Sequence, residues 1–276
     1  MGGRINPIDE YLATLTSPRT AERYRAALSE FADWYTQTTG ASVDWNLLTT
    51  VEVKDYTAYL QTVRRLSPAS VNLRLAALRS FLRHLGRTLK VKGPKQVTPP
   101  VKALSDRELG RLLAAAEGST RDTAILNLLA RTGLRVGEVV HLRVGDVEMN
   151  GRSGWLTVRG GKGNKTRHVP LNGEVRQALK AWLDERPQGA GDDLFLSRTG
   201  KPLSERDVQR MVAEYARIAA VEATPHTLRH TFATRAIEKG VDVATLAAIL
   251  GHSRLETTGR YLHPTAERIQ EAVEGI

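Results

Sequence analysis

The sequence of 276 residues contains no cysteine. Disulfide bonds, thiolate catalysis and cysteine-ligated zinc sites are therefore excluded, and a reducing cytoplasm suits the composition. No apolar run approaches the roughly 18 residues that a membrane span needs. The first residues, Met-Gly-Gly-Arg-Ile-Asn-Pro, lack the apolar stretch of a signal peptide. We expect a cytoplasmic protein with no membrane segment.

Acidic residues are missing between Tyr56 and Ser105, although the protein has 30 of them in total. Residues 1–103 hold 15 Lys and Arg against 8 Asp and Glu, whereas residues 104–276 hold 25 against 22. Stretches with charges of a single sign are usual where a protein follows a phosphate backbone. A nucleic-acid partner is expected, and a solvated basic face without a partner is the alternative.

The length suits two domains, and the chain divides at residues 89–103. This stretch has two proline-rich turns and no hydrophobic period, which predicts an extended basic linker. Residues 1–88 contain four helical patterns, of which the second and fourth open with a capping serine and a proline, Ser17-Pro18 and Ser67-Pro68. The fourth carries an apolar stripe of Val71, Leu75, Leu78, Leu82 and Leu85, and a basic flank of Arg74, Arg79 and Arg83.

Residues 104–276 combine helices with a small sheet. Ser105 and Glu108 form a capping box, and an apolar helix at about 121–131 ends at Gly133, after which a new helix begins around Arg135. Two β-like runs, 155–158 and 167–171, flank a glycine-rich hairpin tip at 159–166. Further helices are expected around residues 172–185, 205–220, 225–239, 242–250 and 266–275. The predicted fold is mostly α with a small β-sheet, an α+β domain after a helical one.

Thr224-Pro225 predicts a helix whose first turn carries His226 and Arg229 on one face. Such a helix start suits a phosphate, because its backbone N–H groups are free and its dipole end is positive. An imidazole can exchange a proton near neutral pH, and a guanidinium can hold two oxygens. His226 and His230 could instead bind zinc, but the glutamate of the metalloprotease motif is missing. We expect no metal, and we expect His230 to pack inward and form a hydrogen bond.

Two further cations precede this helix in the chain. Arg135 and Glu138 stand three residues apart. They are either a surface ion pair, worth at most about 1 kcal/mol, or a phosphate-clamping arginine that its carboxylate holds in one rotamer. Lys162 lies at the glycine-flanked hairpin tip, where it is either a plain turn residue or a general acid that reaches a leaving oxygen.

Residues 242–253 begin with an acidic cap, continue as a short apolar helix and end in Gly251-His252-Ser. By themselves they resemble the first half of a helix-turn-helix DNA reader. Nine residues after His252 comes Tyr261, which is either a core residue or a presented hydroxyl that can attack a phosphate. Clustered cationic and imidazole donors near a tyrosine, without a metal-ligand cluster, favour phosphodiester cleavage that needs no metal.

The order and spacing of these residues resemble the active site of the tyrosine recombinases, the site-specific recombinase and phage integrase family. The motifs concerned are Thr-Gly-Leu-Arg-Val-Gly-Glu, Gly-Lys-Gly-Asn-Lys, His-Thr-Leu-Arg-His-Thr-Phe-Ala-Thr and Leu-Gly-His-Ser. The resemblance covers essentially the whole chain. It implies a SAM-like core-binding domain at 1–88, the linker at 89–103, and a catalytic domain with a C-terminal tail helix at 104–276. The implied catalytic residues are Arg135, Lys162, His226, Arg229, His252 and Tyr261, with Glu138 and His230 in support.

The implied reaction is attack of Tyr261 on a phosphate of duplex DNA, which forms a 3′-phosphotyrosine and releases a 5′-hydroxyl without any cofactor. The two arginines bind the non-bridging oxygens, and Lys162, which the family motif favours over Lys165, protonates the leaving oxygen. His226 takes or shares the phenolic proton, and His252 donates to a phosphoryl oxygen. The residues expected to contact the DNA backbone are Arg74, Arg79, Arg83, Lys90, Lys92, Lys95 and Lys165.

The resemblance also implies four protomers on two DNA segments, in the cytoplasm at the nucleoid. Residues 266–276 carry an apolar stripe, which docks either on a neighbouring protomer or on the chain's own core. A type IB topoisomerase, which would relax supercoils as a monomer, stays an alternative. So does a regulator that binds DNA without forming a covalent adduct.

Overall fold

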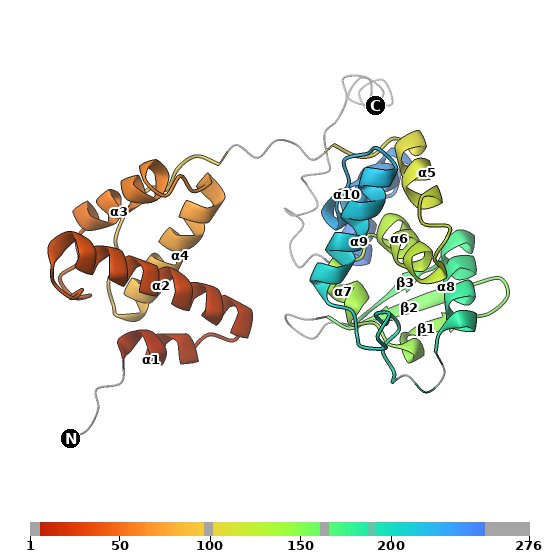
Figure 1. The fold of residues 1–276 in the computed structure, drawn as a ribbon, viewed down its shortest axis with the longest axis horizontal. Coiled ribbons are helices and arrows are strands. Elements are labelled where there is room, and N and C mark those ends of the chain that lie inside the picture. The colour runs from red at the N-terminus through yellow and green to blue at the C-terminus, as the bar shows by residue number, and fades with distance from the viewer. Residues whose placement is uncertain (1–5, 97–101, 161–165, 188, 190, 252–276) are drawn as a thin grey trace. The chain divides into compact units, whose positions relative to one another are not determined.

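The computed structural model describes residues 6–96, 102–160, 166–187, 189 and 191–251. The chain divides into two compact units, Met1–Pro99 and Pro100–Ile276, each with its own hydrophobic core. Figure 1 shows a helical N-terminal unit and a C-terminal unit that combines helices with a small sheet. In the described ranges, no helix is both long and apolar enough to cross a membrane.

The N-terminal unit consists of four helices, which confirms the four helical patterns. The hydroxyl groups of the predicted caps Ser17 and Ser67 accept hydrogen bonds from the N–H groups of Thr20 and Ser70, each at 3.3 Å. A proline occupies the first turn after each cap, where its missing N–H costs nothing. The helices are α1 (Pro7–Ala13), α2 (Pro18–Thr39), α3 (Thr50–Thr62) and α4 (Pro68–His84).

The core of the N-terminal unit is aromatic where α2 meets α3. Phe31 and Tyr56 are fully buried, and their rings stand edge-on with centroids 4.9 Å apart, a favoured geometry for aromatic pairs. The predicted stripe of α4 is buried from Val71 to Leu82, while Leu85, just past the helix end, is half-buried. The stripe therefore fixes which face of α4 points inward.

Two of the α4 arginines expected to contact DNA are engaged inside the unit. Arg74 donates from Nε to Glu30 Oε2 of α2 at 2.6 Å, and Arg79 donates to the carbonyl of Val91. Arg83 is exposed. Arg74 and Arg79 thus have structural roles that the sequence pattern did not anticipate, whereas Arg83 keeps its side chain on the surface of the unit.

The first part of the predicted linker packs against α4. Val91 is only 6% exposed and belongs to the core of the N-terminal unit. Asn72 Nδ2 donates to the carbonyl of Pro94 at 3.1 Å. At Gly93 a Cβ atom would lie 1.9 Å from Asn72 Oδ1, so a glycine is needed for this close approach. Residues 89–96 have no helix or strand, as predicted, but they are docked on the unit, and their lysines Lys90, Lys92 and Lys95 are exposed.

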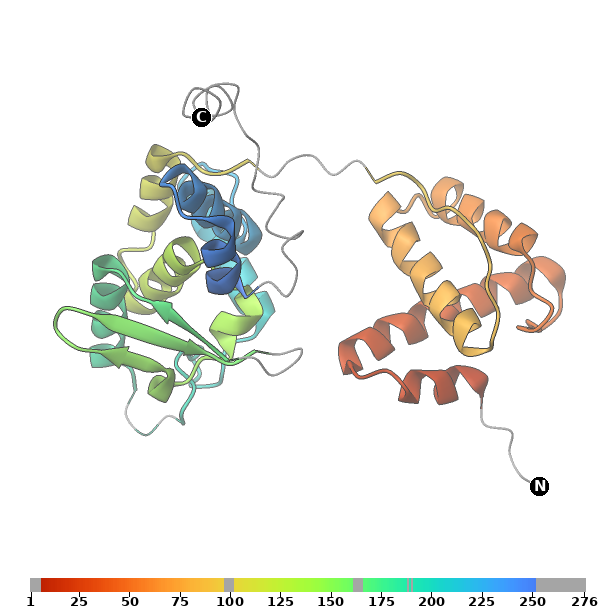
Figure 2. The same ribbon diagram turned by 180° about the vertical axis from the view of Figure 1, so that it is seen from behind.

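The C-terminal unit contains seven described α-helices and a three-stranded antiparallel sheet at one side (Figure 2). Two of the strands, β2 (Gly154–Val158) and β3 (Arg167–Pro170), were predicted. The third, β1 (Val147–Met149), was not, because a three-residue strand carries almost no periodicity. The order is β1-β2-β3, with Leu156 of β2 opposite Val147 and Val169.

The helices of the C-terminal unit surround α6, which packs against α8 and α10. The capping box at Ser105 is confirmed, and so is the left-handed glycine that ends α6 at Gly133. The helices are α5 (Asp106–Ala114), α6 (Thr120–Thr132), α7 (Val136–Val140), α8 (Gly173–Glu185), α9 (Glu205–Ile218), α10 (Pro225–Glu238) and α11 (Val243–Leu250).

Helix α10 also holds the first residues of its unit. The backbone N–H of Leu104 donates to the buried Thr231 Oγ1 at 2.9 Å, and Arg235 donates to the Leu104 carbonyl at 3.2 Å. Arg235 is also ion-paired with Asp106 at 2.8 Å. These contacts fix the entry of the chain into this unit on the helix that carries His226 and Arg229.

Candidate active site

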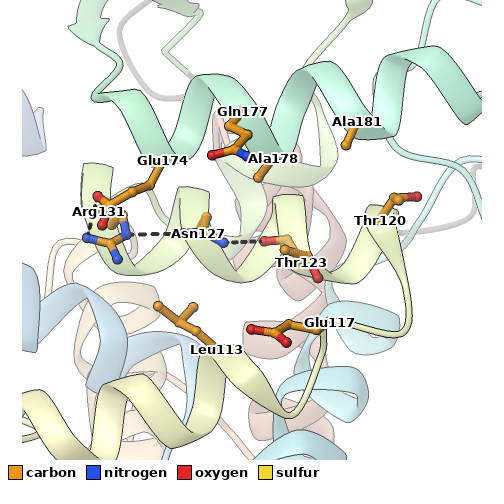
Figure 3. Close-up of a pocket in the computed structure, with 10 residues that line it drawn as sticks. All are labelled: Leu113, Glu117, Thr120, Thr123, Asn127, Arg131, Glu174, Gln177, Ala178 and Ala181. Atoms are coloured by element: carbon orange, nitrogen blue, oxygen red, sulfur yellow. Dashed lines mark hydrogen bonds and ion pairs between the residues drawn. The ribbon is translucent and has the colours of Figure 1, made fainter.

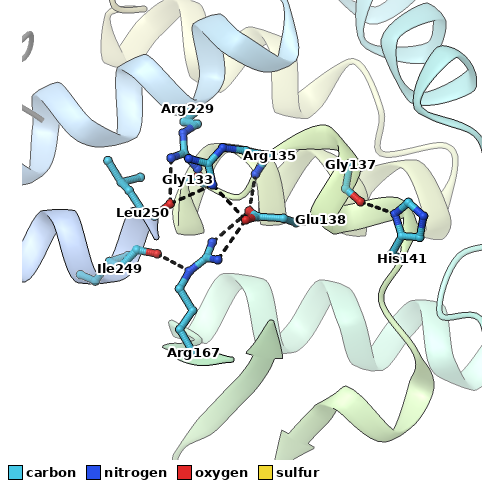
Figure 4. Close-up of polar contacts among 9 residues, drawn as sticks. All are labelled: Gly133, Arg135, Gly137, Glu138, His141, Arg167, Arg229, Ile249 and Leu250. Atoms are coloured by element: carbon cyan, nitrogen blue, oxygen red, sulfur yellow. Dashed lines mark hydrogen bonds and ion pairs between the residues drawn. The ribbon is translucent and has the colours of Figure 1, made fainter. Parts of the chain in front are cut away.

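A tight turn between α6 and α7 forms one wall of the site. Gly133 has φ +64°, and a Cβ atom there would lie 2.5 Å from the Phe232 ring and 2.7 Å from Leu250. A glycine is therefore required both for the backbone conformation and for the close approach of α10 and α11. The turn places Arg135 directly before α7 and beside the end of α11 (Figure 4).

Arg135 is the N-cap residue of α7, and Glu138 is its partner three residues later. The backbone N–H of Arg135 donates to Glu138 Oε2 at 2.8 Å, and Nη1 donates to Oε1 at 3.1 Å. Nη1 also reaches the carbonyl of Leu250 at 3.3 Å. The Arg135 side chain is 46% exposed and that of Glu138 13% exposed. Glu138 therefore holds Arg135 from the buried side, while the arginine still faces solvent.

Arg229 approaches the same place from α10. The helix begins as predicted, with Thr224 as cap and Pro225 in the first turn. His226 lies in that first turn, whereas Arg229 is the fifth helical residue and lies in the second turn, one residue further than expected. Arg229 is 5% exposed. Its guanidinium donates to the carbonyls of Gly133 and Leu250, the latter at 2.8 Å.

A third arginine, which the sequence analysis missed, completes the cluster. Arg167 of β3 donates from Nη1 and Nη2 to the two oxygens of Glu138, both at 2.9 Å, and from Nε to the carbonyl of Ile249 at 2.8 Å. A signal was present: Arg167 shares the inward face of its strand with the buried Val169. A charged group on an inward face needs a partner.

We call Arg135, Arg167, Arg229 and Glu138 the arginine cluster (Figure 4). Three guanidinium groups oppose one carboxylate, so the cluster keeps a positive surplus. The last carbonyls of α11, at the negative end of its dipole, draw the guanidinium groups together. Burial would raise the pKa of Glu138, but hydrogen bonds from Arg167 and the Arg135 amide, with the charges of both arginines, hold this pKa below its usual value. The carboxylate is thus ionised at neutral pH, and the surplus suits an anion such as a phosphate.

The histidines of α10 differ in exposure. His226 is exposed at the start of the helix, and His230 is half-buried. Among the described residues, no group of three potential ligands could hold a metal ion. Lys162, Lys165, His252, Tyr261 and the tail at 266–276 lie outside the described residues. Gly251, the residue before His252, has φ +64° and closes α11 directly beside the arginine cluster.

A cavity of about 430 Å³ lies elsewhere, between α5, α6 and α8 (Figure 3). Its wall carries Glu117, Glu174 and Arg131, and Arg131 is ion-paired with Glu174 at 2.8 Å. Of the predicted catalytic residues that the structure describes, Arg135, His226 and Arg229, none lines it. The arginine cluster, by contrast, brings together three of the predicted site residues, Arg135, Arg229 and Glu138.

Comparison with known proteins identifies the class. Residues 102–268 match the phage integrase family, and residues 9–90 match the phage integrase N-terminal SAM-like domain. The tyrosine recombinase XerC of Pelobacter propionicus is 36% identical over 273 residues, which cover 94% of this chain and 89% of the relative. XerA of Pyrococcus furiosus is 36% identical over 212 residues, 74% of this chain and 73% of the relative. The crystal structure of XerH bound to difH substrate has a TM-score of 0.76 and 23% identity, and it covers 92% of this chain and 78% of that chain.

The chain belongs to the phage integrase family. More particularly, it is a Xer-like tyrosine recombinase with a SAM-like N-terminal domain, an enzyme that acts on DNA by cleavage and rejoining. The predicted fold and the predicted class of enzyme are confirmed.

Proposed function

We propose that Tyr261 cleaves duplex DNA at a specific site, forming a 3′-phosphotyrosine and releasing a 5′-hydroxyl. The observation that carries this proposal is the convergence of Arg135 and Arg229 on the end of α11. Two guanidinium groups at one point can bind the non-bridging oxygens of one phosphate and offset the charge that develops during transfer. The DNA strand stays linked to the protein, so a 5′-hydroxyl can reverse the step without an energy source.

The remaining roles follow from chemistry at the same phosphate. His226 is exposed and lies in the first turn of α10, where it can accept or share the phenolic proton. Lys162 protonates the leaving 5′-oxygen, and His252 donates to a phosphoryl oxygen. Glu138 supports Arg135, to which it is directly bonded. His230, half-buried on the same helix as His226, supports the site from within.

The test of this function is a covalent trap. Protein incubated with fragmented genomic DNA of its own organism, then denatured in SDS, yields adducts whose sequenced DNA identifies the site. In a nicked duplex of that site, cleavage releases a short strand that carries the 5′-hydroxyl. This strand diffuses away, so the 5′-hydroxyl cannot reverse the step and the adduct accumulates. We expect an SDS-resistant adduct that forms equally in EDTA. Dependence on a divalent metal would contradict the mechanism. Relaxation of supercoiled DNA lacking the site, by a monomer, would instead favour the topoisomerase alternative.

We further propose that four protomers assemble on two sites through the tail at 266–276. The apolar stripe of the tail is suited to docking on a neighbouring protomer. Deletion of 266–276 is expected to leave binding to a single site intact and to abolish the complex of two sites, as measured by light scattering. If the protein that lacks 266–276 still joins two sites, the tail docks on its own chain.

DNA binding is proposed to involve the exposed basic residues of the N-terminal unit. These are Arg83, Lys90, Lys92 and Lys95, and Lys165 is a further candidate. The proposed location is the cytoplasm, at the nucleoid, where an enzyme that acts on cellular DNA finds its substrate. A plot of the logarithm of the binding constant against the logarithm of the salt concentration has a negative slope. Removing one phosphate contact should reduce the size of this slope by about one.

A further inference from the structure

Arg167 lies where three parts of the site meet, and each of its three guanidinium nitrogens donates a hydrogen bond there. Two nitrogens bind the Glu138 carboxylate and the third binds the Ile249 carbonyl. Its side chain is only 14% exposed. A Cβ atom at Gly251 would lie 2.7 Å from Arg167 Nη1, so the glycine before His252 is required for this guanidinium to fit. Arg167 therefore joins β3 to α7 and to the end of α11, and these hydrogen bonds are all with the protein.

The carboxylate of Glu138 is saturated only when Arg167 is present. Oε1 accepts from Arg167 and from Arg135 Nη1, and Oε2 accepts from Arg167 and from the Arg135 backbone N–H. A carboxylate has about four acceptor positions. The contacts of Arg167 are the shorter side-chain contacts, at 2.9 Å, against 3.1 Å for Arg135. Arg167 is thus the principal counter-ion of Glu138.

Because Arg167 fills two acceptor positions of Glu138, Arg135 keeps donors for a phosphate. Within the described part of the chain, the contacts of the Arg135 guanidinium all run through Nη1. Nε and Nη2 point to no described partner. Without Arg167, a buried carboxylate would be left with two open acceptor positions, and Arg135 would be its nearest cation. A buried charge of this kind is costly, so Arg135 would be drawn from the phosphate to the carboxylate.

We propose that Arg167 is a positioning residue of the recombinase site, which neutralises Glu138 so that Arg135 stays available for the scissile phosphate. The proposal rests on the proposed function of Arg135. Because this role runs through Glu138, loss of Arg167 should lower the rate of cleavage and leave the affinity for DNA almost unchanged.

The experiment compares Arg167→Met with the wild type on the nicked duplex of the recovered site, with protein in excess. We expect cleavage to slow by about 10- to 100-fold, by analogy with the loss of a group that orients a metal ligand, with an unchanged dissociation constant. Arg176→Met is the matched control. Arg176 lies next to the same sheet and donates to the Leu171 carbonyl at 2.7 Å, with no described carboxylate partner, and its loss should leave the rate unchanged.

A second comparison separates positioning from mere stability. In the double variant Glu138→Gln/Arg167→Met, the charge that would capture Arg135 is gone, so the double variant should cleave faster than Arg167→Met alone. Glu138→Gln also removes the cost of an unpaired buried charge, so each rate is divided by the folded fraction. If Arg167 only stabilised the fold, the two corrected rates would be equal, and that result overturns the proposal. A wild-type rate in Arg167→Met overturns it as well.

The folded state of each variant is checked by thermal unfolding. If Arg167→Met does not fold, Arg167→Lys replaces it in both comparisons, because lysine keeps the charge but cannot form the three directed bonds. A wild-type protein that forms no adduct contradicts the proposed function instead. The two failures are therefore distinguishable.

Discussion

Tyr261→Phe is expected to bind the recovered site with wild-type affinity and to form no SDS-resistant adduct. Phenylalanine keeps the ring but lacks the oxygen that attacks phosphorus, so no other group can form the same ester. A phenol has a pKa near 10, and its attack at neutral pH depends on the surrounding donors and on a proton acceptor. Binding depends on many contacts with the DNA backbone, and a single hydroxyl contributes little to it.

Tyr215→Phe is the matched control for this experiment. Burial, then the hydrogen bond to Asp122 and the charge of that carboxylate, raise the pKa of Tyr215 to about 12, so its hydroxyl is a poor nucleophile. Its loss removes a 2.9 Å hydrogen bond to the buried carboxylate of Asp122 and should cost about 1.5–3 kcal/mol of stability. Adduct formation should continue. An adduct of normal yield in Tyr261→Phe would show that another residue is the nucleophile.

The elements of the fold that were predicted correctly depend on local chemistry. A serine followed by a proline favours a helix start through local contacts, as at Ser17 and Ser67, and the stop at Gly133 needs only a left-handed residue. The short strand β1 was missed because three residues form a strand only next to a partner. The burial of Val91 likewise depends on its contact with the core that includes α4. Residues 89–96 have no hydrophobic period of their own, so the sequence pattern could not reveal this contact.

In the site, too, local motifs could be predicted, whereas contacts between residues distant in sequence could not. Arg135 and Arg229 could be predicted from motifs, but the reason why they meet is the end of α11, whose carbonyl at Leu250 accepts from both. Arg167 stands 29 residues from Glu138 and 82 from Ile249, so no local pattern indicated its partners. The engagement of Arg74 by Glu30, 44 residues away, was hidden in the same way. A basic count alone could not show which arginines are engaged within the fold.

Arg229→Lys is expected to slow cleavage by about 100- to 1,000-fold, which corresponds to about 2.7–4 kcal/mol for one aligned donor at a developing charge. Lysine keeps the positive charge, but it cannot span the carbonyls of Gly133 and Leu250 as the planar guanidinium does. The ammonium group would therefore bind one carbonyl or the phosphate. Affinity for DNA should change far less, because Arg229 is 5% exposed while the basic residues of the N-terminal unit lie on the surface.

The measurement is single-turnover cleavage of the nicked duplex with protein in excess, together with thermal unfolding and a binding curve. Arg131→Lys is the control, because Arg131 lies on α6 and is partly exposed beside the ion-paired Glu174; surface substitutions of this kind change stability by about 0.5 kcal/mol or less. The rate in Arg229→Lys must fall by more than the folded fraction does. If rate and affinity fell together, Arg229 would serve binding in general. The parallel loss would place the phosphate of the transition state elsewhere than at the end of α11.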